Sequence, residues 1–235
     1  MVKKPEENKK KDDRPFWKKP MTYILGGVLL VMIIFGALAS SDIAGTKGSI
    51  SYVDFQNDFC RPEGNLYVNG AETAKANIIA YLKSSNPENV SVILTRDWHN
   101  VYDHSFKQNG GIWPTHCVAG TWGAEVDKDI IEVLNEKGFN YMYSNKGTCP
   151  NIEEYGAFST IYETNEGVVV KNVNDSYETL IVDKTVDVCG IAGDYCVKET
   201  VKNLKESGLF NIEVLLDCVA SIDDGTTIKE FVDTL

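Results

Sequence analysis

Hydrophobic positions along the chain follow two different periods, which predicts strands and helices in alternation. Short β-branched apolar runs, typical of buried parallel strands, alternate with segments whose apolar residues recur at helical spacing. The expected strands are Ser49–Phe55, Val90–Leu94, Phe139–Tyr143, Val186–Ile191 and Ile212–Leu216. The expected helices are Ala71–Lys83, Val126–Lys137 and one that begins near Asp194. This alternation predicts an α/β three-layer sandwich, in which helices cover both faces of a mostly parallel sheet.

An uncharged segment precedes this domain. Residues 21–40 contain no Asp, Glu, Lys or Arg, and the run is long enough to cross a bilayer as one helix. Residues 1–20 carry seven Lys, one Arg and four acidic residues, which predicts a disordered basic tail on the cytoplasmic side. Residues 41–48 are expected to form a tether, and residues 49–235 the folded domain. The sequence therefore predicts a single-pass membrane protein whose folded domain is extracytoplasmic.

This topology leaves two questions open. A cleaved signal peptide is the alternative to an anchor, because Ala37-Leu38-Ala39 resembles a cleavage site. An extracytoplasmic domain would also expose six cysteines to oxidation. Their spacing indicates neither a disulfide nor a zinc ribbon, and Cys189 and Cys218 are expected to be buried.

The charge of the chain is uneven and excludes one class of partner. The 235 residues carry a formal net charge of −11, and because residues 1–20 carry +4, the remainder carries −15. An acidic domain repels a phosphate backbone, so nucleic acid is not an expected partner. A neutral or cationic small molecule is the expected class of substrate.

Cys196 lies between an expected strand and an expected helix, where α/β folds present reactive side chains. The unpaired N–H groups and the positive dipole end of a helix N-terminus favour a thiolate there. A buried, inert cysteine is the alternative that this segment leaves open. The polar residues that follow the other expected strands are Asp54, Asp97, His99 and Lys146. We expect all of them at one edge of the sheet, because parallel strands end together.

The three histidines of the chain, His99, His104 and His116, fall within 18 residues, which favours a shared role such as metal binding. Asp97 and His99 are two residues apart and would share a face of an extended segment, while His116 could close the site from the next loop. These ligands leave coordination positions for water and substrate. Unrelated loop histidines are the alternative, and His104, unlike His116, lies in a polar stretch where solvent exposure would be unremarkable.

Five motifs follow one another from about Ser49 to Ser221. They are Val53–Cys60, Thr95–His99, Trp113–Val118 followed by Gly120-Thr121, Lys146–Thr148 with Tyr155–Phe158, and Gly190–Val197. In this order they resemble the nicotinamidase branch of the isochorismatase-like cysteine hydrolases, which have a Rossmann-like fold. The resemblance implies hydrolysis of nicotinamide to nicotinate and ammonia through a cysteine thioester, a step of NAD salvage.

The resemblance also implies a role for each matching residue. The implied catalytic residues are Asp54, Lys146 and Cys196. The implied ligands of one divalent metal ion are Asp97, His99 and His116, with His104 as a candidate fourth contact. An oxyanion hole is implied at the backbone N–H groups of Ala192 and Cys196, after a cis peptide bond. The implied walls of an aromatic pocket are Phe59, Trp113 and Tyr155.

These implied neighbours suggest how the cysteine reacts. A free thiol is mostly protonated at neutral pH, so Lys146 and the helix N-terminus are expected to stabilise the thiolate while Asp54 accepts the proton. Attack on a carboxamide then gives an oxyanion for the two N–H groups. Zinc is the expected metal, and iron and manganese also suit mixed nitrogen and oxygen ligands.

The chain departs from the family at several positions. Gly193 stands where Thr is usual and Gly156 where Ser is frequent, so a looser or differently shaped pocket is expected. Residues 159–184 fit the family poorly, which leaves substrate preference and homo-oligomer contacts open. A carbamoyl or ureido compound is the alternative substrate. A non-catalytic, membrane-anchored binding module is the alternative outside the enzymes.

Overall fold

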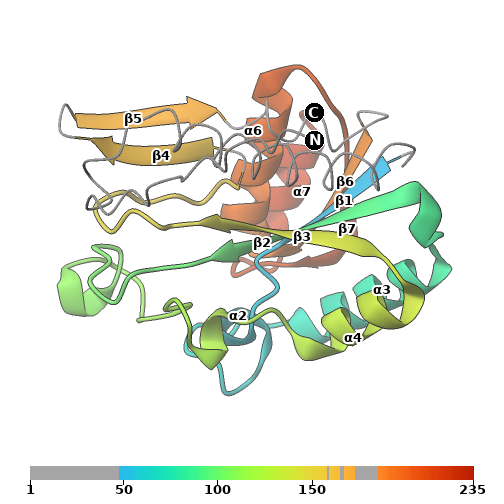
Figure 1. Cartoon of the computed structure of the whole chain (residues 1–235), viewed down its shortest axis with the longest axis horizontal. Coiled ribbons are helices and arrows are strands. Elements are labelled where there is room, and N and C mark those ends of the chain that lie inside the picture. Colours follow the sequence, from blue (N-terminus) through green and yellow to red (C-terminus); the bar gives the residue numbers. More distant parts are fainter. Residues whose placement is uncertain (1–47, 158, 165–166, 173–184) are drawn as a thin grey trace, which may run out of the picture. The chain divides into compact units, whose positions relative to one another are not determined.

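The central feature of the fold is a five-stranded parallel sheet. The computed structural model describes residues 48–157, 159–164, 167–172 and 185–235. The sheet consists of β1 (Gly48–Val53), β2 (Val90–Asp97), β3 (Asn140–Lys146), β6 (Thr185–Ile191) and β7 (Asn211–Ala220). Its order is β3-β2-β1-β6-β7, and every neighbouring pair is parallel (Figure 1). A separate antiparallel hairpin pairs β4 (Ser159–Thr164) with β5 (Gly167–Asn172).

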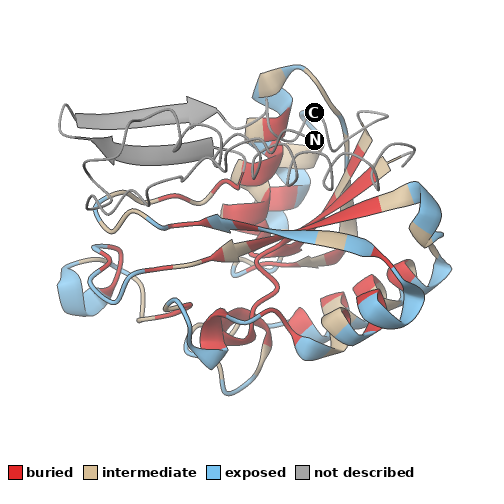
Figure 2. Ribbon diagram, viewed as in Figure 1, coloured by how far each residue is buried: buried red, intermediate tan, exposed pale blue. Residues whose placement is uncertain are grey.

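Helices cover both faces of the sheet and enclose two apolar cores. The helices are α2 (Asn57–Cys60), α3 (Ala71–Ser84), α4 (Lys128–Lys137), α6 (Lys198–Ser207) and α7 (Thr226–Val232). α3 and α4 pack on one face, and α6 and α7 on the other (Figure 1). Successive β1 residues face opposite cores, Tyr52 toward α3 and Val53 toward α6. Each fully buried large apolar side chain contributes about 1.5–3 kcal/mol, so the apolar helix faces hold the three layers together (Figure 2).

A buried carboxylate fixes the segment between β1 and α3. Asp127 caps α4 by accepting a hydrogen bond from the Asp129 N–H at 2.9 Å. Its other oxygen lies 2.8 Å from Arg61 Nε and 3.3 Å from Lys75 Nζ. Because Arg61 directly follows α2, these ion pairs fix α2 against α3 and α4.

Gly190 allows β6 to approach the carboxyl end of β1. Its φ is +127°, and a Cβ atom there would lie 2.0 Å from the carbonyl oxygen of Val53. No side chain fits so close a backbone contact. The approach brings the residue after β1, Asp54, near the turn that follows β6.

The parallel α/β architecture predicted from the hydrophobic pattern is confirmed, and the differences lie at element ends. β3 and β7 extend to Lys146 and Ala220, further than their apolar runs. A π-helical turn, Gly193–Val197, precedes α6, so Cys196 lies in that turn and not in an α-helix. The pattern did not predict the short α2, α7 or the hairpin β4–β5, because none carries a long periodic apolar run.

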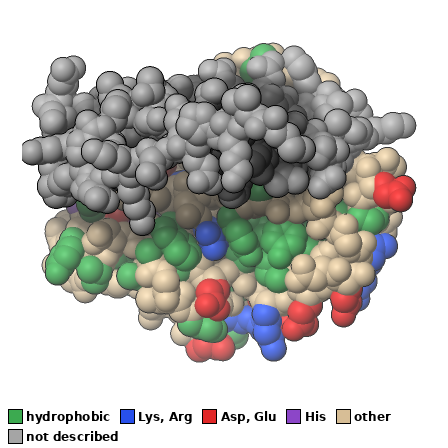
Figure 3. Space-filling view, in the orientation of Figure 1, with side chains coloured by type: hydrophobic (Ala, Val, Ile, Leu, Met, Phe, Trp, Pro, Cys, Tyr) green, Lys and Arg blue, Asp and Glu red, His purple; other side chains and the backbone are tan. Residues whose placement is uncertain are grey.

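The strand β3 forms one edge of the sheet and exposes apolar side chains. Met142 and Tyr143 are both exposed. In the space-filling view, hydrophobic side chains lie across the middle of the described face, with charged side chains nearer the α3 and α4 side (Figure 3). Large exposed residues on an edge strand are unusual, since edges commonly carry charge.

The predicted localisation is corrected. The tail at 1–20, the membrane helix at 21–40 and nearly all of the tether at 41–48 lie outside the described residues. Within the described ranges, no helix is both long and apolar enough to span a bilayer. The longest α-helix there, α3, has 14 residues, about 21 Å at 1.5 Å per residue. That is short of the roughly 30 Å hydrocarbon core, so the described residues give no support to the predicted single-pass, extracytoplasmic arrangement.

The six cysteines all lie within the described residues, and none of them forms a disulfide in this structure. Cys189 and Cys218 are buried, as expected from their apolar surroundings. The four others are Cys60, Cys117, Cys149 and Cys196, of which only Cys149 is partly exposed.

Candidate active site

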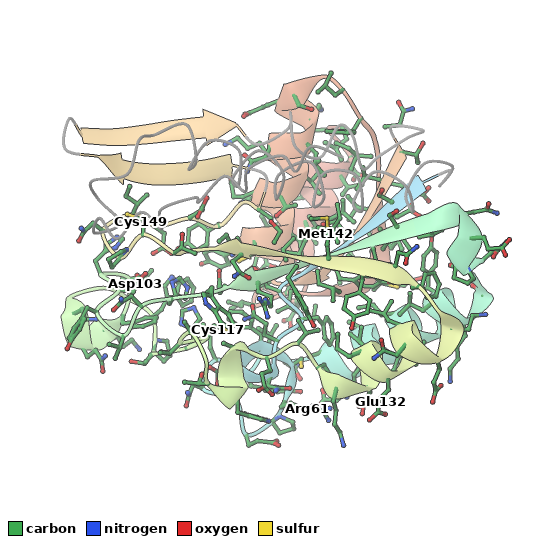
Figure 4. The ribbon with its side chains drawn as sticks, in the orientation of Figure 1. Arg61, Asp103, Cys117, Glu132, Met142 and Cys149 are labelled. Carbon is green, nitrogen blue, oxygen red and sulfur yellow. The ribbon has the colours of Figure 1, made fainter. Side chains whose placement is uncertain are left out.

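Polar residues from four neighbouring strands meet at the carboxyl edge of the sheet. Asp54 follows β1, Asp97 and Lys146 are the last residues of β2 and β3, and Cys196 lies in the turn after β6. The β2–β3 register places Asp97 directly beside Lys146. Figure 4 shows the segments beyond these strand ends, with Asp103, Cys117 and Cys149 labelled on them.

Lys146 is the centre of this cluster. Its ammonium group is almost completely buried, 2.8 Å from Asp54 Oδ2 and 3.5 Å from Cys196 Sγ, and it also contacts Asp97 Oδ1. Burial alone would lower the pKa of Lys146, but Asp54 and Asp97 hold it well above its usual range. A buried cation between two carboxylates and a thiol is therefore fully charged, and it compensates both carboxylates.

Asp54 is held in an uncommon backbone conformation. Its φ is +47°, in the left-handed region that non-glycine residues rarely adopt. Thr95 fixes it there, because its hydroxyl donates to Asp54 Oδ1 at 2.8 Å and its carbonyl accepts the Asp54 N–H at 3.3 Å. Burial raises the pKa of Asp54, against the opposing effect of Lys146. The carboxylate is thus a stronger base than an exposed aspartate.

The thiolate expected at Cys196 does not match the electrostatics. Burial raises the pKa of Cys196 well above its usual range, and Asp54 and Asp97 add to the rise that Lys146 opposes. Lys146 already neutralises two carboxylates, so its positive charge stabilises a thiolate at Cys196 only weakly. Burial and the two carboxylates therefore favour the thiol form of Cys196 at rest. Asp54 is the nearby acceptor for the thiol proton, because one of its carboxylate oxygens lies within 4.8 Å of Cys196 Sγ.

Asp97, His99 and His116 converge on a second point beside this cluster. Asp97 Oδ2 lies 3.6 Å from His99 Nε2 and 3.8 Å from His116 Nε2, and all three side chains are buried. The Nδ1 atoms are engaged elsewhere, His99 with Asp103 Oδ2 at 3.0 Å and His116 with the Pro114 carbonyl at 2.8 Å. Both Nε2 atoms therefore face the same carboxylate oxygen. Together these three atoms form the donor set of a three-residue metal site.

A second set of possible metal ligands consists of Asp54, Asp97 and Cys196, whose ligand atoms also lie within 4.8 Å of one another. Lys146 Nζ already contacts all three side chains. The ammonium group takes the place of a cation there, so the fit to a metal favours the histidine pair. Burial alone would raise the pKa of Asp97, but Lys146, His116 and His99 hold it well below its usual range, which keeps the carboxylate ionised for a metal.

His104 is not brought to this group. Its side chain is exposed and its Nδ1 bonds to the Pro150 carbonyl at 2.9 Å. The same Nδ1 lies 3.8 Å from Asp103 Oδ1. The structure gives no support to His104 as a fourth metal contact.

A pocket with aromatic walls opens beside Cys196 and the metal ligands. Phe59, Trp113 and Tyr155 line it, as do Asp97, His116, Ala192 and Cys196. Trp113 Nε1 donates to the Tyr155 hydroxyl at 3.0 Å, and the Tyr195 ring packs edge-on against Trp113 with 5.1 Å between centroids. These contacts fix the walls, which suit a flat aromatic ring.

Two comparisons with known proteins decide the family. A family model described as the isochorismatase domain matches residues 51–144. The nicotinamidase/pyrazinamidase of Mycobacterium tuberculosis is 32% identical over 184 residues, covering 75% of this chain and 88% of that protein. The chain belongs to the nicotinamidase branch of the isochorismatase-like hydrolases. It is therefore an enzyme of the amidase class, and the resemblance seen in the five motifs is confirmed.

Solved structures agree with this family. The nicotinamidase of yeast superposes with a TM-score of 0.66 at 27% identity, covering 80% of this chain and 94% of that one. The pyrazinamidase of Pyrococcus horikoshii, determined in complex with zinc, gives 0.61 at 29% identity, covering 80% and 95%. A pyrazinamidase relative thus binds zinc, and the Asp97, His99 and His116 donor set of this chain is consistent with one divalent ion.

The two glycines that depart from the family motifs have a steric reason. A Cβ at Gly193 would lie 2.1 Å from Ser221 Oγ, and one at Gly156 would lie 2.1 Å from Asn203 Nδ2. Ser221 and Asn203 fill the space that a larger residue would take. The looser packing expected at these glycines is therefore not found.

Sequence reasoning missed several residues of the site. Thr95 and Tyr195 lay inside the quoted motifs, and Tyr195 directly precedes the cysteine, so their proximity was a usable signal. Asp103 is four residues after His99, but it was overlooked beside His104. Leu66, Val68 and Ile222 also line the pocket and carried no signal of chemistry.

Gly147→Ala is expected to weaken metal binding at least about tenfold, as lost orientation of a metal ligand typically does. A Cβ at Gly147 would lie 2.5 Å from His99 Cε1, and the glycine has a φ of +62°. The ring of His99 must therefore move. Metal content after dialysis against a chelator measures the effect.

Gly138→Ala is the matched control for this variant. Gly138 is also left-handed, with a φ of +76°, but a Cβ there would meet no heavy atom within 4 Å. Both variants bear the same kind of backbone strain, about 1–2 kcal/mol, and only one touches His99. Equal metal retention in the two variants would contradict the steric argument.

Proposed function

We propose that this protein hydrolyses nicotinamide to nicotinate and ammonia through a thioester on Cys196. One observation carries the proposal: Lys146 Nζ contacts both Asp54 and Cys196, and Cys196 lines an aromatic pocket. A thiol, a carboxylate base and a buried cation suit acyl transfer, and the walls suit a pyridine ring. The names of the yeast and M. tuberculosis relatives support the same substrate.

The first half-reaction forms the thioester. Asp54 takes the proton of the Cys196 thiol as Sγ attacks the carboxamide carbon, and the carbonyl oxygen becomes an oxyanion. The backbone N–H groups of Ala192 and Cys196 hold this oxyanion, in the turn after the cis peptide bond Ile191–Ala192. Asp54 then returns its proton to the amide nitrogen. The carbon–nitrogen bond breaks, ammonia leaves and the acyl group stays on sulfur.

The second half-reaction restores the thiol. Asp54 removes a proton from water as the water oxygen attacks the thioester carbonyl, and the same N–H groups hold the second oxyanion. The carbon–sulfur bond breaks, Asp54 returns its proton to the sulfur, and the carboxylic acid product gives up its own proton to solvent and leaves as its anion. Throughout, Lys146 keeps its charge next to Asp54 and Cys196, where it stabilises the carboxylate and the sulfur anion in turn.

The aromatic walls and the metal ligands position the substrate ring. Phe59, Trp113 and Tyr155 enclose the flat faces of the ring and exclude water from the thioester. Asp97, His99 and His116 would hold a divalent ion at the rim of this pocket. When bound, the ion supplies an electron-pair acceptor suited to a pyridine nitrogen or to water.

Removal of the metal is expected to lower amide hydrolysis at least about tenfold, because substrate orientation is lost while the cysteine cluster stays intact. Ammonia release is measured before chelation, after chelation, and after addition of zinc, iron or manganese. The ion that restores turnover identifies the working metal. Full turnover by protein that elemental analysis finds free of metal would contradict the role given to these ligands.

The test of the function is direct. Purified protein is incubated with nicotinamide, and ammonia and nicotinate are quantified together. Equimolar release of both supports the proposal. Release of ammonia from a ureido or carbamoyl compound, with nicotinamide left unchanged, would refute the substrate while retaining the cysteine chemistry.

A further inference from the structure

We propose that Asp103 is a positioning residue that fixes the tautomer and orientation of His99 and strengthens its Nε2 as a metal donor. The proposal rests on the metal site of the proposed function. Asp103 belongs to none of the five motifs, and it follows His99 by one helical turn of sequence. Its side chain is almost completely buried.

The Asp103 carboxylate is held at both oxygens. Oδ2 lies 3.0 Å from His99 Nδ1, and Oδ1 accepts the Ser105 N–H at 2.9 Å. The backbone is fixed as well, because the Asp103 N–H donates to the Asn100 carbonyl at 2.9 Å and Asn109 Nδ2 donates to the Asp103 carbonyl at 2.7 Å. A carboxylate so restrained presents one oxygen to the imidazole in a single geometry.

This contact decides which nitrogen of His99 carries the proton. A carboxylate only accepts hydrogen bonds, so Nδ1 must be the N–H donor. In the neutral ring, the form that binds a metal, Nε2 then keeps its lone pair, and it lies 3.6 Å from Asp97 Oδ2. The negative charge behind the ring also makes Nε2 a better donor to a metal, as carboxylate–histidine–metal arrangements do.

The surroundings of the ring leave it no other orientation. Phe106 packs edge-on against it with 5.4 Å between centroids, and His116 does so at 5.0 Å. Gly147 lies so close that a Cβ there would meet the ring. His116 is held differently, because its Nδ1 bonds to the neutral Pro114 carbonyl. Of the two imidazoles, His99 alone has a charged partner behind it.

Asp103→Asn separates positioning from simple loop structure. An asparagine has one acceptor oxygen, which serves either Ser105 N–H or His99 Nδ1–H, and its NH₂ group must face the other. With the NH₂ group facing His99, the proton moves to Nε2 and the metal donor is lost. Asn109→Ala is the matched control, because it removes the side-chain bonds to the Asp103 and Val101 carbonyls and leaves the carboxylate untouched.

The experiment measures zinc affinity by competition with a chromophoric chelator, on full-length protein without substrate. Asp103→Asn is expected to raise the zinc Kd 10–100-fold, and Asn109→Ala less than about threefold. An unchanged Kd in Asp103→Asn overturns the proposal, and so does an equal loss in both variants, which would indicate loop structure alone. Zinc affinity is independent of turnover, so a failure of nicotinamide hydrolysis is distinguished from a failure here.

A second measurement needs no variant. Long-range ¹H–¹⁵N spectra of the zinc-loaded wild-type protein report the tautomer of its three histidines. Protonated Nδ1 and unprotonated Nε2 at His99 support the proposal. The opposite tautomer at His99 overturns it, even if Asp103→Asn does not fold.

Discussion

Cys196→Ala is expected to abolish amide hydrolysis and to leave the fold intact. The substitution removes only a buried sulfur, and among the described residues Cys196 is the thiol that contacts Lys146 Nζ. Loss of a nucleophile from a catalytic triad costs several orders of magnitude in kcat, and we expect about 10⁴-fold or more. Ammonia release from nicotinamide measures activity, and thermal unfolding measures the fold.

Two companion variants sharpen this result. Cys196→Ser keeps a hydroxyl beside Lys146 but is expected to remain inactive, since an alcohol gives up its proton far less readily than a thiol. Cys149→Ala is the matched cysteine control, because Cys149 is partly exposed and is not among the residues that line the pocket beside Cys196. It should retain activity. Substantial turnover by Cys196→Ala would refute the thioester mechanism.

Lys146→Met is expected to abolish activity and to lower the free energy of unfolding by about 3–5 kcal/mol at neutral pH, as removal of one partner from a buried ion pair typically does. Asp54 and Asp97 would lose the cation that contacts both. Urea unfolding measures the loss. Lys202→Met is the control, because Lys202 pairs with Glu199 at the surface at 3.4 Å and such pairs contribute little.

The stability loss of Lys146→Met should depend on pH in a defined direction. Burial already raises the pKa of Asp54, and without Lys146 this pKa rises further above the unfolded value of 3.8. A carboxyl whose folded pKa is raised destabilises the protein increasingly as pH rises above the unfolded value. The difference between variant and wild type should thus be smaller at pH 5 than at pH 8. A loss that is equal at both pH values would argue against an uncompensated carboxylate at this position.

The strand ends were the part of the site most readable from the sequence. Asp54, Asp97, Lys146 and Cys196 follow apolar runs, and the carboxyl ends of parallel strands meet at one edge. Their mutual contacts were not readable, because they depend on the sheet order β3-β2-β1-β6. Lys146 could equally have been a surface lysine until the β2–β3 register placed it beside Asp97.

The other differences between the sequence predictions and the structure arise from burial and loop geometry. The sequence suggested that Lys146 would give a thiolate at Cys196, but the cost of burial and the repulsion from Asp54 and Asp97 outweigh that attraction. Residue type favoured His104 over Asp103, whereas the turn at 100–106 directs the carboxylate inward and the imidazole outward. Such directions depend on backbone dihedral angles that no apolar pattern encodes.

The position of β3 has a consequence for how activity is lost under stress. Within the five-stranded sheet of the described residues, β3 pairs with β2 alone, yet it supplies Lys146. Edge elements open with a smaller free energy than the global value, as native-state hydrogen exchange reports. Fraying of this one strand would withdraw the ammonium group while the other four strands remain paired. We therefore expect activity to be lost at a lower urea concentration than the one that unfolds the whole domain. On dilution of the urea, activity should return without global refolding.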